Sequence, residues 1–134
     1  MRRITRLMAA GFAAILFSTS VSASGDVSLG ERAALQAAMQ QYVDHKTVDG
    51  AYLLFDMQTA EVRELYPVTG HPIVMQLDEH FVLCFDFADA KGRKVEVDYY
   101  LARKDNGFVV FHEAVGSRKI LEAMMKRGRV KPVN

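Results

Sequence analysis

The stretch FVLCFDFA (residues 81–88) decides the fold. Large apolar side chains at 81, 83, 85 and 87 would lie on one face of an extended strand, and Val82, Cys84 and Asp86 would lie on the other. Bulky apolar residues at every second position are typical of a strand that turns one face toward a core. We therefore expect residues 81–88 to form a central strand.

The segment AKG (residues 90–92) predicts the first partner of this strand, because it fits a three-residue hairpin loop with glycine in a left-handed conformation. This loop places Cys84 opposite Asp98 and Asp86 opposite Glu96. The apolar side chains at 95, 97, 99 and 101 then join the phenylalanine face, so the hydrophobic pattern supports the register.

A second loop of the same kind is predicted at DNG (residues 105–107). It pairs Tyr100 with His112 and Leu101 with Phe111. The result is an antiparallel meander of adjacent strands.

Helices are expected at both ends of this meander. Ser28 and Glu31 form a capping box, and apolar residues at helical spacing then predict a helix over 29–46. Short strands are expected at 51–56, 61–68 and 73–77, with residues 66–72 as a stiff exposed loop. Ser117 can cap a short basic helix that buries residues 120, 121, 124 and 125 and ends at Gly128, before a frayed tail over 129–134.

These elements predict an α+β domain, in which an N-terminal helix packs on a curved antiparallel sheet of four to five strands and a short C-terminal helix follows. The element order from residue 28 to 115 resembles the cystatin-like folds, of which nuclear transport factor 2-like domains are a larger relative. The Gln-x-Val-x-Gly loop of inhibitory cystatins is absent from the sequence. The resemblance implies a pocket or a dimer face on the sheet.

The first 23 residues read as a secretory signal peptide. Three arginines precede an apolar run over 7–17, and Val21-Ser22-Ala23 fits a signal-peptidase site. The apolar run is too short for a membrane span, which needs about 20 residues. We therefore expect export by the Sec pathway, cleavage near Ala23, and one domain over residues 24–134.

Charge and cysteine content narrow the class of protein. The whole chain carries a net charge of +1, and removal of residues 1–23 leaves 14 basic and 16 acidic residues, which does not suggest a nucleic-acid partner. The chain has one cysteine and therefore no intramolecular disulfide, which favours a bacterial periplasm over a eukaryotic secretory route. No further apolar run reaches spanning length, so we expect a soluble periplasmic protein with no membrane span.

The even-numbered side chains of the two hairpins share the sheet face that is turned away from the long helix. Polar Asp98, Tyr100 and His112 are neighbours there, and Val82, Phe108 and Val110 add apolar surface that a purely solvated face does not need. The candidate contact residues are therefore Tyr100, His112, Asp98, Val82 and Val110. A solvent face whose polar residues merely alternate with the core is the alternative.

We favour a non-enzymatic module that binds a small ligand or a periplasmic protein through this open face, or that pairs two such faces in a homodimer. The rival hypothesis is a small hydrolase or isomerase that uses Asp98, His112 and Tyr100. Cys84 lies too far from His112 for a nucleophile pair, and no cofactor is expected. No metal site is expected either, although Asp86, Glu96 and Asp98 could hold a hard cation weakly.

Overall fold

Helix α1 (Leu29–Lys46) begins as the capping box predicts. The Ser28 hydroxyl accepts a hydrogen bond from the Glu31 amide at 3.2 Å, and the Glu31 carboxylate accepts one from the Ser28 amide at 3.1 Å. The computed structural model describes residues 27–133. The predicted signal peptide over 1–23 lies outside the described residues.

A single curled antiparallel sheet follows α1, and the structure has the α+β architecture that the sequence predicts. The sheet has eight strands, so the expectation of four to five was too low. No strand was predicted at Thr47–Val48 or at Val130–Pro132, since two or three residues are too short to carry an alternating pattern. The strands are β1 (Thr47–Val48), β2 (Ala51–Asp56), β3 (Glu61–Gly70), β4 (Met75–Leu77), β5 (His80–Ala88), β6 (Lys94–Lys104), β7 (Gly107–Val115) and β8 (Val130–Pro132).

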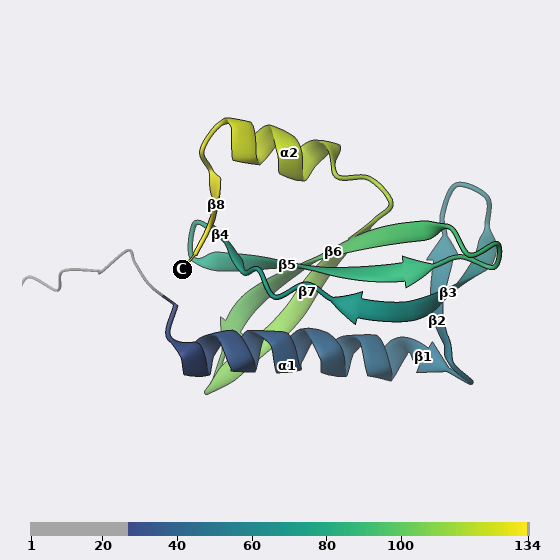
Figure 1. The fold of residues 1–134 in the computed structure, drawn as a ribbon, viewed down its shortest axis with the longest axis horizontal. Coiled ribbons are helices and arrows are strands. Elements are labelled where there is room, and N and C mark those ends of the chain that lie inside the picture. The colour runs from purple at the N-terminus through teal and green to yellow at the C-terminus, as the bar shows by residue number, and fades with distance from the viewer. Residues whose placement is uncertain (1–26, 134) are drawn as a thin grey trace, which may run out of the picture.

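Strand β5 is the centre of the sheet. β6 pairs along one of its edges, while β3 and β4 share the other, and β8 pairs with β4. The predicted register of β5 and β6 is confirmed, with Cys84 opposite Asp98 and Asp86 opposite Glu96. Helix α1 lies along one side of the sheet (Figure 1). The odd-numbered side chains of both strands pack against α1, which contributes buried Leu35, Met39 and Val43 to the main core.

The pairing of β6 with β7 differs from the prediction in the length of the connecting loop and in one β-bulge. Lys104 pairs with Gly107, so the connecting loop has two residues and not three. This shift alone would break the predicted pair of Tyr100 and His112, but a β-bulge at Phe111 adds one residue and restores it. Leu101 therefore pairs with Val110, and the predicted pair of Leu101 with Phe111 is wrong.

Strand β3 runs through part of the segment that was expected to be a loop. Its first half pairs with β2, and its second half, from Tyr66 to Gly70, pairs with β5. The register shifts between Pro67 and Thr69, and proline is tolerated in a strand at such an irregularity. The exposed loop expected over 66–72 therefore begins only after Gly70.

The C-terminal part of the chain forms a second layer, on the side of the sheet opposite α1 (Figure 1). Helix α2 (Lys119–Lys126) is preceded by Arg118 at its N-cap, so the expected cap at Ser117 is wrong. Leu121 of α2 is buried as expected, but Ile120 and Met125 are exposed. The tail is not frayed, because β8 pairs with β4 and buries Val130 beside Leu121.

The docking of β8 predicts a measurable loss of stability on truncation of one side chain. Replacing Val130 with alanine should lower the free energy of unfolding by about 1 to 2 kcal/mol, since it leaves a small cavity in a buried cluster. Urea denaturation followed by circular dichroism measures this change. Lys131→Ala, at the exposed neighbouring position, is the control, and equal stability of the two variants would contradict the docked tail.

Candidate functional site

The candidate site lies on the outer face, by which we mean the side of β5, β6 and β7 that is turned away from α1. The middle of this face is not open as predicted, because α2 and β8 lie over it. Leu121 and Val130 pack there against Val82, Cys84 and Tyr100. Val82 is fully buried, so its predicted role as an exposed contact residue is wrong.

Val110 does not lie on the outer face at all. The two-residue loop and the bulge reverse the alternation of β7 before Phe111, so Val110 enters the main core under α1, where Phe108 also packs. The candidate residues Val82 and Val110 are therefore buried on opposite sides of the sheet. Val109 takes the outward position that the prediction gave to Val110.

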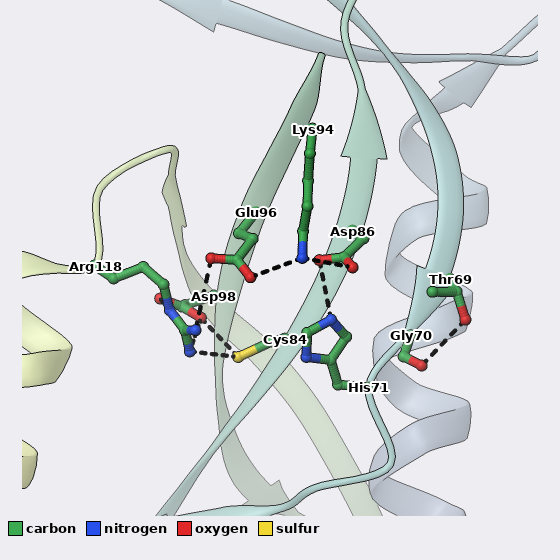
Figure 2. Close-up of polar contacts among 9 residues, drawn as sticks. All are labelled: Thr69, Gly70, His71, Cys84, Asp86, Lys94, Glu96, Asp98 and Arg118. Atoms are coloured by element: carbon green, nitrogen blue, oxygen red, sulfur yellow. Dashed lines mark hydrogen bonds and ion pairs between the residues drawn. The ribbon is translucent and has the colours of Figure 1, made fainter. Parts of the chain in front are cut away.

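Asp98 is buried beneath the start of α2, with 1% of its surface exposed. Arg118 reaches it from the N-cap of α2, with Nη2 3.2 Å from Asp98 Oδ1 and Nε 3.3 Å from Oδ2. The thiol of Cys84 donates to Asp98 Oδ1 at 2.7 Å, and Arg118 Nη2 lies 3.1 Å from its sulfur (Figure 2). A buried carboxylate is costly without a partner, and here it contacts both a cation and a donor.

The contacts of Asp98 and Cys84 bear on two chemical roles: Asp98 as the residue that orients His112, and Cys84 as a nucleophile. Both oxygens of Asp98 contact Arg118, so in this structure the carboxylate orients the guanidinium and not His112. Burial, followed by the hydrogen bond to Asp98, raises the pKa of the Cys84 thiol far above its usual range. The thiolate that a nucleophile needs is therefore disfavoured.

A second polar group lies toward the other end of the same strands, where Asp86 and Glu96 are directly opposite each other. Lys94 Nζ lies 3.0 Å from Asp86 Oδ2 and 3.1 Å from Glu96 Oε1, and His71 Nε2 lies 2.9 Å from Asp86 Oδ1 (Figure 2). Burial alone raises the pKa of Asp86, but the contacts from His71 and Lys94 outweigh it and hold the pKa below its usual range.

Tyr100 and His112 do lie together, as predicted, with ring centroids 5.5 Å apart. Burial, followed by the negative charge of Asp98, raises the pKa of Tyr100. Tyr100 is largely covered by the second layer, whereas His112 is exposed.

Two further rings extend this pair. Phe111 lies 6.4 Å from Tyr100 and 5.4 Å from His80 between ring centroids. We call these four residues, His80, Tyr100, Phe111 and His112, the aromatic patch. An open depression of about 500 Å³ begins at His80 and extends over Gln76, Glu79, Ala102 and Arg103. Phe111 itself is 53% exposed, which is unusual for a ring in the middle of a strand.

Phe111 and His80 were not predicted as site residues. A regular strand would place Phe111 in the core, and only the bulge brings it onto the outer face next to His112. No local signal in the sequence indicates the bulge. His80 directly precedes the strand expected over 81–88, and nothing along the chain shows that it meets Phe111.

No helix within residues 27–133 is long and apolar enough to cross a membrane. Comparisons with protein families, with curated proteins and with solved structures found no match for this chain. The geometry of the outer face therefore carries the functional argument.

The ion pair of Arg118 with Asp98 predicts a loss of stability when the cation is removed. Arg118→Ala should lower the free energy of unfolding by about 2 kcal/mol, because it strands a buried carboxylate, and the cost stays below that of a fully buried pair since water can replace a half-buried guanidinium. Denaturant titration measures the change. Lys119→Ala, at an exposed position of the same helix, should leave stability nearly unchanged, and a similar loss in both variants would contradict the assignment.

The raised pKa of Cys84 predicts slow alkylation. Because the chain has one cysteine, the reaction with iodoacetamide reports on this thiol alone. At mildly alkaline pH the folded protein should react much more slowly than the urea-unfolded protein, since both the thiolate fraction and the access of the reagent are lower. Equal rates would show that the thiol is exposed and ionised in the folded state.

Proposed function

We propose that the protein is an exported, non-catalytic binding module that contacts a partner through the aromatic patch. The observation that carries this proposal is the exposed ring of Phe111, which is supported from beneath by Tyr100 and flanked by His80 and His112. Rigid aromatic side chains of this kind dominate the binding energy of protein interfaces, because they bury a large area and lose little conformational entropy.

The layer beneath the patch supports this function. Tyr100 is fixed between the sheet and α2, so the rings that contact it stand on a rigid base. Preorganised side chains lose less entropy on binding than mobile ones. The patch can therefore take a hydrophobic or aromatic side chain of a partner protein, an apolar small ligand, or the same patch of a second copy.

The rival hydrolase or isomerase receives less support from the contacts. It needs Asp98 to orient His112 as a general base, and Asp98 is paired with Arg118. The location in the periplasm is part of the proposal, and it rests on the pattern of residues 1–23. The relationship to the cystatin-like folds is also proposed, on the order of the elements and the curl of the sheet around α1.

Native mass spectrometry of protein purified from a periplasm tests the proposal. We expect a bound mass, either a ligand, a partner or a second copy, and we expect Phe111→Ser to lose it. Phe55→Ser is the matched control, because Phe55 is 60% exposed on β2 and lies outside the patch. Loss of the bound mass in the Phe55 variant but not in the Phe111 variant, or a bare monomer in the unmutated protein, would contradict the proposed contact surface.

A further inference from the structure

We propose that His71, Asp86 and Glu96 form a binding site for a divalent transition-metal ion, with zinc as the best fit, and that Lys94 occupies the place of the ion in its absence. This site is separate from the aromatic patch. One nitrogen or oxygen atom from each of the three side chains lies within 4.8 Å of the other two.

The backbone brings these three side chains together from three neighbouring segments. Asp86 on β5 and Glu96 on β6 are a directly opposed pair, so their carboxylates leave the outer face side by side. His71 directly follows β3, and its backbone is fixed on both sides: its amide donates to the carbonyl of Cys84 at 2.9 Å, and its carbonyl accepts from Gln36 Nε2 at 2.8 Å. The imidazole is thus held against the carboxylates.

The ligand types favour zinc over calcium or magnesium. Calcium and magnesium prefer sites made of oxygen atoms alone, whereas an imidazole nitrogen with carboxylates suits zinc and related metals. Tetrahedral ligands around zinc lie about 3.4 Å apart, so the most distant pair of ligand atoms, at 4.8 Å or less, has to close by about 1.4 Å at most. Three protein ligands leave the fourth position to water.

Lys94 is the strongest argument for a cation at this point. Its ammonium already lies between the two carboxylates, at 3.0 and 3.1 Å from one oxygen of each. Its side chain is 58% exposed, so few contacts hold it there. Two carboxylates, a neutral imidazole and a divalent ion would be balanced in charge once Lys94 has moved into solvent.

The other contacts of the two carboxylates leave oxygen atoms available for this exchange. Arg118 Nη1 lies 3.6 Å from Glu96 Oε2, the oxygen that Lys94 does not contact. His71 and Lys94 contact Asp86 on different oxygens. Displacement of the Lys94 ammonium therefore frees one oxygen of each carboxylate.

Lys94 competes with the metal ion, whereas His71 binds it. Substitution of these two residues should therefore change the zinc affinity in opposite directions. Zinc affinity is measured by competition with a chromophoric zinc chelator, on protein treated with EDTA, at neutral pH. Lys94→Met should bind zinc about ten-fold or more tightly than the unmutated protein, because it removes the competing cation. His71→Asn should bind it about ten-fold or more weakly, because it removes the nitrogen ligand.

Two controls separate this site from adventitious binding. Lys104→Met and His45→Asn change a lysine and a histidine that are exposed and lie elsewhere on the molecule, and both should keep the affinity of the unmutated protein. Asp86→Asn should weaken binding as His71→Asn does, with circular dichroism to confirm that the variant is folded. The proposal is overturned if Lys94→Met does not gain affinity, if His71→Asn and His45→Asn lose it equally, or if no variant binds zinc.

Discussion

The whole structure depends on the alternation of side chains along β5. Its odd-numbered residues, led by Phe81 and Phe85, enter the core under α1, and its even-numbered residues Val82 and Cys84 enter the second cluster under α2. A shift of one residue in the pairing would exchange these two sets, and would carry Asp86 toward the core. The pattern of one strand thus determines which helix covers which side of the sheet.

Burial of both faces raises the question of what fixes the second layer, since α2 is short and leaves Ile120 and Met125 exposed. A buried ion pair connects the second layer to the sheet. Asp98 is the buried charged residue of the part of the chain that the structure describes, and its cation, Arg118, stands at the N-cap of α2. This ion pair links the start of α2 to β6, and a buried carboxylate that lost its cation would be costly.

Local patterns were enough to predict much of the fold. The capping box of Ser28 located α1, and alternation with a turn located β5 and β6 in their correct register. The pair of Tyr100 and His112 was also predicted, although for an incomplete reason, since a shorter loop and a bulge at Phe111 cancel each other. Such compensation leaves the pair in place but changes its surroundings, which is why Val110 was assigned to the wrong side and Phe111 was missed.

The remaining differences come from contacts between distant parts of the chain. Arg118 meets Asp98, and Val130 meets Val82, but neither residue carries a local signal of its partner. The three residues of β8 form a strand only because β4 offers an edge to them. The residue pattern of the strands therefore does not show whether one face of the sheet is exposed to solvent, since a later segment of the chain can cover that face.

Helix α2 and strand β8 cover the middle of the outer face and leave two chemically different ends. Between them lie Cys84, Asp98 and Arg118, whose polar atoms contact one another. At one end, Lys94 neutralises Asp86 and Glu96 from within the chain, so the strands pair there without mutual repulsion of the two carboxylates. At the other end, the aromatic patch carries an exposed ring, and its stability rests on packing. The buried polar group is nevertheless linked to the Lys94 end, because Arg118 contacts both Asp98 and Glu96.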